Sequence, residues 1–157
     1  MNSKKTIPDF EAYFSEMLSR CDRFKSNKRF FTVNGYDAGA TLLSSLREGD
    51  SPVVMLEDTC DGVLACNDGF LDTIVPGVWI MERVKAADAK ARKAALSACK
   101  AAGFDMIRRI IADRRKNPVA EAFDYSRTSY FPRGPSGNHY WGYEFVLTFK
   151  FDTDMTL

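Results

Sequence analysis

Four cysteines and a single histidine, His139, are the side chains of this 157-residue chain with the most reactive chemistry. A nucleophilic serine or cysteine would have to use His139 as its base, because the chain has no other histidine. His139 follows a Gly- and Pro-rich stretch with no nucleophile motif beside it, which favours an exposed loop histidine. The cysteines lack CxxC spacing, so no structural zinc site is predicted.

The cysteines divide into two pairs by position. Cys21 and Cys99 lie on apolar stripes of predicted helices, where a buried free thiol is usual. Cys60 and Cys66 are close together around a predicted turn, and we expect them to be reduced because no signal-peptide pattern starts the chain. No run approaches the ~20 apolar residues of a membrane span, so we expect a protein made in the cytoplasm without a membrane partner.

The carboxylates and glycines also predict no catalytic or cofactor site. Glu57 and Asp58 are adjacent, but acids are ordinary at a strand end and turn. The acids and amides between residues 58 and 72 lack the spacing of a calcium loop. The glycines of residues 134–137 precede neither a helix nor a Lys-Ser/Thr pair, so they do not form a phosphate loop. We therefore expect no cofactor, no metal and no enzyme.

The strongest electrostatic feature is the stretch 85–116, which has ten Lys or Arg and three Asp and so carries a charge of +7. The whole chain carries +1, so the rest carries −6. Such a stretch binds phosphates of nucleic acid, or it meets water or the acidic part of a neighbouring copy. The second interpretation is favoured, because opposite charges on one chain suit head-to-tail contacts that close into rings. The candidate contact residues are Arg108, Arg109, Arg114, Arg115, Lys116, Arg133 and His139.

The aromatic run at residues 140–151 is the element around which we expect the fold to be organised. Its apolar side chains occupy alternate positions, and mostly polar side chains lie between them, which is typical of a half-buried strand. Twelve residues is long for a strand, so its neighbours should be long as well. The apolar positions are Tyr143, Phe145, Leu147, Phe149 and Phe151.

The first half of the chain predicts helices and strands in alternation. An amphipathic helix extends from Asp9 to Phe24, followed by a strand over 29–33. A second helix covers residues 36–48, with Gly49 placed to cap its end.

The middle of the chain predicts a hairpin and a further strand. The continuous apolar run 52–57 is typical of a strand buried on both faces. Residues 63–66 are predicted to return beside it as a hairpin, and a third strand covers 78–84.

The basic stretch 85–116 is the longest predicted helix. Gly103 lies in its apolar stripe, where it either kinks the helix or lets another backbone come close. A strand is then predicted over 123–131, and a loop over 132–139 leads as a hairpin into the aromatic strand.

The length and the apolar content of 45% predict one domain over residues 1–157 with a substantial core. Its elements lack βαβ regularity. We therefore expect an α+β fold, in which a mainly antiparallel sheet carries an N-terminal helix, a short helix and the long basic helix on one face.

Several stretches carry a resemblance to a known class of proteins. They are Pro52-Val53-Val54-Met55-Leu56-Glu57, Asn67-Asp68-Gly69 with Leu71-Asp72, Val78-Trp79-Ile80-Met81, the basic helix, and residues 138–149. Together they cover less than half of the chain and resemble small neck and tail proteins of phages and prophages of gut bacteria, of the tail-terminator or head–tail connector type. The resemblance implies a ring of identical subunits in a virion, contacts with neighbouring neck or tail proteins, and no catalysis. It transfers no functional residue, because no motif matches position by position.

Two functions remain as expectations. The first is a ring-forming structural protein of a tailed phage or prophage. The alternative is a monomeric module that binds nucleic acid or a small ligand through the basic helix 85–116, with nucleic acid possible but not favoured.

Overall fold

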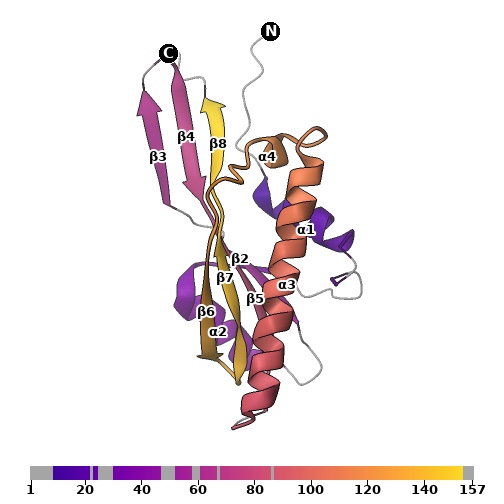
Figure 1. Ribbon diagram of the computed structural model, residues 1–157. Coiled ribbons are helices and arrows are strands. Elements are labelled where there is room, and N and C mark those ends of the chain that lie inside the picture. Colours follow the sequence, from indigo (N-terminus) through magenta and orange to yellow (C-terminus); the bar gives the residue numbers. More distant parts are fainter. Residues whose placement is uncertain are drawn as a thin grey trace.

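The computed structural model describes residues 9–21, 23–24, 30–46, 52–57, 61–66, 68–85 and 87–153 (Figure 1). The predictions for Gly49 and Cys60 lie outside these residues, as do residues 58–60 of the turn predicted over 58–62, whereas Asp61 and Gly62 belong to a strand. The helices are α1 (Phe10–Ser19), α2 (Gly35–Ser45), α3 (Ala89–Asp113) and α4 (Pro118–Glu121). The strands are β1 (Phe30–Val33), β2 (Val53–Glu57), β3 (Asp61–Cys66), β4 (Phe70–Val75), β5 (Gly77–Arg83), β6 (Ser129–Ser136), β7 (Tyr140–Val146) and β8 (Phe149–Thr153).

The strands form two sheets. The larger has the order β1-β2-β5-β7-β6, and the smaller, which we call the arm, has the order β3-β4-β8. β1 and β2 are parallel, and the other described strand pairs are antiparallel. The arm extends away from α3 and the larger sheet (Figure 1). The predicted α+β fold with a mainly antiparallel sheet is confirmed.

A single long ribbon connects the sheets. β5 pairs with β7 in the larger sheet, and β4 pairs with β8 in the arm. The last pair of the larger sheet is Gly77↔Val146, and the first pair of the arm is Ile74↔Phe149. Each of the two chain segments has two residues between these pairs, so the register continues without an insertion. The aromatic run is therefore divided between two sheets, and its partner, β4 followed by β5, is as long as expected.

The predicted apolar face of the aromatic run is confirmed on both sides of this division. Phe145, Leu147 and Phe149 are fully buried, and Tyr143 and Phe151 pack against the same cluster. The aromatic run therefore keeps its apolar side chains on the side of the core in both sheets.

The helices lie on both faces of the larger sheet, which corrects the prediction of one face. α1 and α3 cover the face that carries Val54 and Leu56. α2 covers the opposite face, where Leu43 packs with Met55 and Trp79. The β2 side chains are apolar on both faces of the sheet, as predicted for a strand buried on both faces. Each face therefore needs a helix to cover it.

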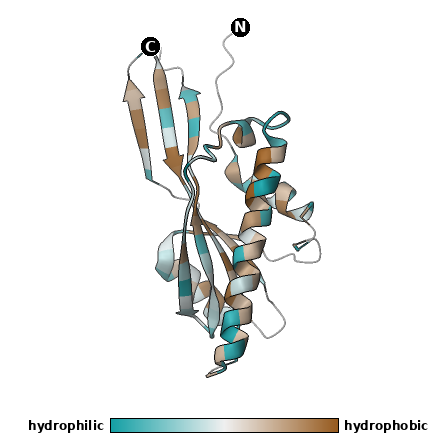
Figure 2. Cartoon of the chain, in the orientation of Figure 1, coloured by the Kyte–Doolittle hydropathy of each residue, from teal (hydrophilic) through white to brown (hydrophobic). Residues whose placement is uncertain are grey.

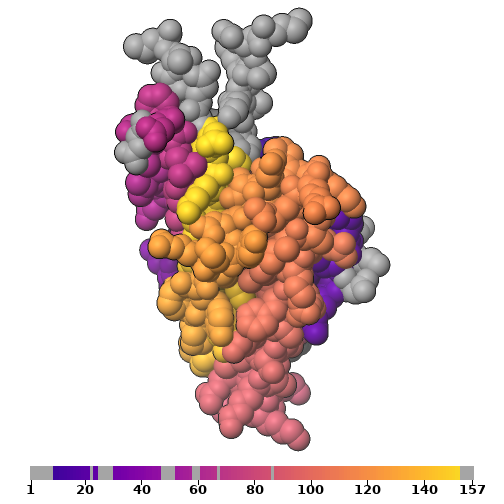
Figure 3. Space-filling model, turned by 45° about the horizontal axis from the view of Figure 1, so that its top comes forward, coloured from indigo at the N-terminus to yellow at the C-terminus, as the bar shows by residue number. Residues whose placement is uncertain are grey.

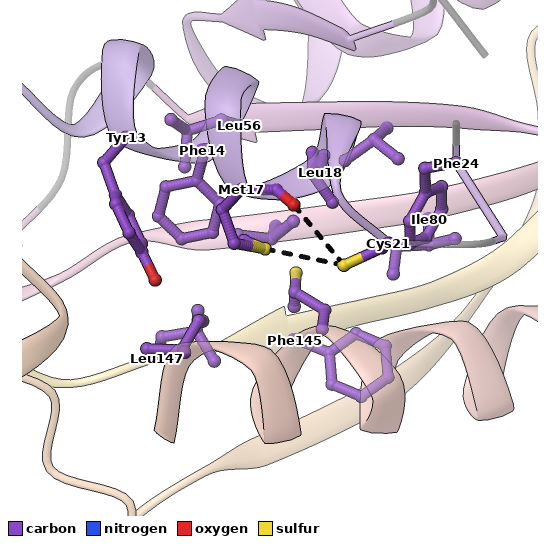
Figure 4. Packing of buried hydrophobic residues seen from close by; sticks show 14 of the residues in the cluster. Tyr13, Phe14, Met17, Leu18, Cys21, Phe24, Leu56, Ile80, Phe145 and Leu147 are labelled. Carbon is purple, nitrogen blue, oxygen red and sulfur yellow. Dashed lines mark hydrogen bonds between the residues drawn. The ribbon is translucent and has the colours of Figure 1, made fainter. Parts of the chain in front are cut away.

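α1 begins where predicted, because the Asp9 carboxylate accepts a hydrogen bond from the Ala12 N–H at 2.9 Å. The helix ends at Ser19, earlier than predicted, but Cys21 and Phe24 remain buried beyond it. Figure 4 shows this side of the core, with the side chains of α1 packed on the strands and α3. The predicted buried free thiols of Cys21 and Cys99 are confirmed.

α3 is shorter than the predicted range 85–116. It starts after Asp88, whose carboxylate accepts a hydrogen bond from the Ala91 N–H, and it ends at Asp113. Asn117 then caps α4, since its side chain accepts a hydrogen bond from the Val119 N–H at 2.8 Å. α3 stays one helix across Gly103, and an aromatic side chain, not a backbone, occupies the space beside this glycine.

Two predictions of strand pairing were wrong. β2 lies between β1 and β5, so it forms no hairpin with β3. β3 instead pairs with β4, a strand that was not predicted because the polar Asp72 and Thr73 interrupt its apolar residues. The residues of the predicted strand 123–131 contribute only an isolated bridge at Phe123 and the first residues of β6.

The predicted loop 132–139 is mostly strand. β6 runs through Pro132 and Pro135 to Ser136, with a register shift after Arg133. A proline cannot donate to a strand partner, but β6 is an edge strand with one open side, so its prolines are tolerated.

Candidate interaction surface

The outward face of α3 is the centre of the candidate site. The inward positions, which are buried, include Ala95, Cys99, Ala102, Met106 and Ile110. On the opposite side, the spacing of three and four residues places one exposed or half-buried stripe along the helix. This stripe consists of Ser97, Ala101, Phe104, Arg108, Ile111 and Arg115. The start of α3 is hydrophilic, and apolar residues are more frequent along its second half (Figure 2).

Large apolar side chains are exposed on this stripe and beside it. Phe104 is 37% exposed, Ile111 is 40% exposed, and Tyr130 of β6 is 40% exposed. The rings of Phe104 and Tyr130 are in edge contact, with centroids 5.6 Å apart. Neighbouring exposed apolar groups of this kind are typical of a protein interface.

Cations lie over the aromatic rings of the same region. Lys100 Nζ is 4.9 Å from the centroid of the Tyr130 ring, and the Arg114 guanidinium is 4.8 Å from that of Tyr125, which is 56% exposed. Each contact holds a positive charge beside an exposed ring. We define the helix surface as Lys100, Phe104, Arg108, Ile111, Arg114, Arg115, Tyr125 and Tyr130.

The acids of this part of α3 face α1. Asp105 accepts from Arg23 Nε at 2.6 Å and pairs with Arg108 at 3.1 Å. Asp113 is buried, and both its oxygens accept from Arg20, at 3.0 and 2.7 Å. Asp105 offsets part of the charge of Arg108, but the helix surface remains positive, because it contains four cations and no acid.

The Asp113 carboxylate fixes α3 on α1. Tyr13 also donates to it, at 3.1 Å. Burial alone would raise the pKa of Asp113, but the hydrogen bonds from Arg20 and Tyr13 outweigh it and leave that pKa lowered. Burial first, and then the charge of Asp113, raise the pKa of Tyr13.

The basic residues predicted as contacts do not all face outward. Arg108, Arg115 and Lys116 are exposed, whereas Arg114 is half-buried under Tyr125. Arg109 is half-buried beside Cys21, on the α1 side of the helix. The structure therefore brings Arg108, Arg114, Arg115 and Lys116 to one end of α3 and turns Arg109 toward the core.

Arg133 does not belong to the helix surface. Its Nε donates to Glu144 Oε2 at 2.7 Å. The Glu144 and Glu57 carboxylates converge on Gly77, where an added Cβ would meet both groups within 3.0 Å. Burial first, and then the nearby Glu144, raise the pKa of Glu57. Arg133 thus balances a carboxylate pair on the α2 side of the sheet.

His139 lies near the other end of α3. Its carbonyl accepts from the Val84 N–H at 2.9 Å, and its φ is 63°. With Lys85, Arg92 and Trp141 it lines an open cavity of about 260 Å³. α3 is 25 residues long, which corresponds to about 37 Å, so His139 and Lys116 cannot share one contact patch.

The aromatic part of the helix surface was not predicted from the sequence. Phe104 is in helical phase with Arg108 and Ile111, a pattern that was available from the sequence. The contact of Tyr130 with Phe104 was not available, because it depends on the tertiary position of β6.

No family model matches the chain, and no curated protein matches it. Among the described residues, no three His, Cys, Asp or Glu side chains come together as ligands for a metal. No described helix combines the length and apolar character of a membrane span.

Proposed function

We propose that this protein is a structural component of a tailed phage or prophage, a ring-forming neck or tail-terminator subunit that catalyses no reaction. It is made in the host cytoplasm and ends in the virion. Its partners are copies of itself and neighbouring neck or tail proteins. The proposal joins the resemblance of the sequence to the properties of the helix surface.

The observation that carries the proposal is the apolar character of the helix surface. Phe104 and Ile111 lie among exposed basic side chains, and no element of the described chain covers them. A solvated basic helix needs no exposed aromatic residues, whereas a subunit interface combines apolar centres with charged rims. The helix surface therefore supports a contact with another protein.

The distribution of charge supports head-to-tail contacts. The stretch 85–116 carries +7 and the rest of the chain −6. Two different, oppositely charged surfaces attract when copies meet head to tail, and repeated contacts of this kind close into a ring. An isologous contact would instead place the helix surface of one copy against the same charges of another.

The test is the solution mass, measured by light scattering across protein concentration and salt. We expect a discrete oligomer at low salt that dissociates as salt rises, because screening weakens contacts between opposite charges. Arg108→Glu with Arg115→Glu should lower the mass at a given concentration. Asp37→Lys with Thr41→Lys, at exposed positions of α2, is the control and should leave the mass unchanged. A monomer at high concentration and low salt would overturn the proposal.

A second candidate is nucleic-acid binding by the same surface. The cations over Tyr125 and Tyr130 combine charge and rings, which are the groups that bind single-stranded nucleic acid. Fluorescence anisotropy with labelled single- and double-stranded DNA distinguishes the candidates. Salt-dependent binding that Arg108→Ala with Arg115→Ala removes would favour this function. No binding at low salt would exclude it.

A further inference from the structure

The arm has a second face that nothing in the described chain covers. β4 alternates so that Phe70 and Ile74 point to one face, and Leu71 and Val75 point to the other. Apolar residues on both faces are typical of a strand that is covered on both sides. All six residues of β4 are nevertheless only half-buried, and all six of β3 are exposed. One face of the arm therefore lacks a partner.

The inner face is the covered one. The Phe10 ring of α1 makes edge contacts with Phe149 at 5.0 Å and with Phe151 at 5.9 Å. Ile74 packs against the same cluster. By the register of the arm, these residues share a face with Leu64, so the core of the protein extends under this side of the arm.

The outer face consists of the alternate residues. Val63, Ala65, Leu71 and Val75 supply its apolar part. Val63 is 68% exposed, the highest value among the large apolar side chains of the described chain. The register places Asp61 at one end of β3, on this same face, and it is exposed.

The outer face is also acidic. The exposed Asp61 supplies this charge, since Lys150 of β8, on the same face, is balanced by Asp124 Oδ2 at 2.8 Å. The outer face therefore offers apolar side chains beside negative charge. The helix surface offers apolar side chains beside positive charge.

We propose that the outer face of the arm in one copy docks on the helix surface of the next copy. This inference rests on the proposed ring and names its two complementary surfaces. Five of the eight large apolar side chains that are exposed in the described chain belong to these surfaces. They are Val63 of the outer face, and Phe104, Ile111, Tyr125 and Tyr130 of the helix surface.

The two surfaces meet between copies and not within one. α3 packs against β5, β7, α1 and α4. The arm projects beyond these elements (Figure 1), and the space-filling view shows it at one edge of the face that α3 and β6 form (Figure 3). A contact between different surfaces on different copies is heterologous, as a ring requires.

The experiment exchanges the charges of the two surfaces. The arm variant carries Asp61→Lys and Ala65→Lys, both at exposed positions of β3. The helix variant carries Arg108→Glu and Arg115→Glu. Each variant alone should need about tenfold more protein to form the oligomer, because like charges then face each other. A chain with all four substitutions should restore the wild-type mass, since its arm and its helix surface again carry opposite charges, whatever the number of copies in the ring.

Each outcome separates the inference from the proposed function. If the wild type and the arm variant have the same mass but the helix variant dissociates, the ring stands and the arm is not its second surface. If the chain with all four substitutions does not restore the oligomer although both variants are weakened, the two surfaces do not meet, and the inference is overturned. A monomeric wild type overturns both proposals. Near-ultraviolet circular dichroism confirms that each variant is folded, and Asp37→Lys with Thr41→Lys is the charge-matched control for the arm variant.

Discussion

The phenyl ring of Phe145 occupies the space in which residue 103 would carry a side chain. An ideal Cβ on Gly103 would lie 1.9 Å from Phe145 Cζ, far inside contact distance. Phe145 is fully buried near the C-terminal end of β7. The missing side chain therefore lets α3 approach the sheet closely enough to bury this ring.

We predict that Gly103→Ala destabilises the protein. Alanine would favour the helix by about 1 kcal/mol, but overpacking in a filled core typically costs about 1–3 kcal/mol. The clash should therefore outweigh the helical preference. The measurement is the free energy of unfolding from urea titration.

Ser97→Ala is the matched control, because Ser97 is exposed on the same helix. It should leave the stability unchanged or raise it slightly. A stabilised Gly103→Ala variant would show that α3 and β7 move apart without cost. Phe145→Leu combined with Gly103→Ala should recover part of the loss, since it removes the clashing ring.

The Asp113 carboxylate gives a prediction with a defined pH dependence. Asp113→Asn should lower the free energy of unfolding at pH 7 by about 1–3 kcal/mol, because it removes the charge that Arg20 and Tyr13 bind. The pKa of Asp113 is lowered in the folded protein, so its contribution is complete above the ordinary value of about 3.9. It is lost as the pH falls through the lowered pKa.

The difference between the wild type and Asp113→Asn should thus stay constant from pH 7 to about 5 and shrink at lower pH. Asp105→Asn is the comparison, because its ion pair with Arg23 is more exposed and should be worth less than about 1 kcal/mol. Equal losses from both substitutions would contradict the assigned role of Asp113.

Glu57 should behave in the opposite way. Its pKa is raised, first by burial and then by Glu144, so the folded protein binds this proton more tightly than the unfolded chain does. The contribution of Glu57 to stability therefore improves as the pH falls from neutral toward the ordinary glutamate value. Glu57→Gln removes the charge and should stabilise the protein at pH 7.

This gain should disappear at acidic pH, where the wild-type side chain is protonated as well. Thermal unfolding of the two proteins at several pH values measures it, with Glu121→Gln at an exposed position as control. A Glu57→Gln variant that is less stable at pH 7 would show that the charge itself is required beside Gly77.

Thiol labelling distinguishes the described cysteines. Cys66 is exposed, whereas Cys21 and Cys99 are buried, and burial raises the pKa of both buried thiols. An alkylating reagent should modify Cys66 in the folded protein, and Cys21 and Cys99 only after denaturation. Peptide mass mapping locates the label. Rapid modification of Cys99 in the folded protein would mean that α3 separates from the sheet in solution.

The sequence predicted the elements whose apolar periodicity is regular. α1, α3 and the aromatic run have a clear period of 3.6 or two, β2 and β5 are continuous apolar runs, and all are present. The predictions failed where turn residues lie within strands. β6 contains Pro132, Gly134 and Pro135, and β4 contains Asp72, so local composition indicated loops at both places. Pairing with a neighbouring strand overrides that local preference.

The positive charge of the candidate site was predicted from the sequence, but the positions of its side chains were not. The basic helix and the exposure of Arg108 and Arg115 followed from the sequence. The inward position of Arg109 and the distance of Arg133 from the helix surface did not, because they depend on α1 and on the register of β6. The outer face of the arm could not be predicted either, because β4 was not predicted as a strand.

The continuous ribbon has a mechanical consequence for the arm. Only Pro76 separates β4 from β5, and only Leu147 and Thr148 separate β7 from β8. The Leu147 N–H donates to the Pro76 carbonyl at 3.0 Å, so the two crossings are held to each other. A force applied at the tip of the arm therefore acts as torque on β5 and β7, the strands that carry α3. The arm is therefore a direct continuation of these two strands and not a flap attached by loops.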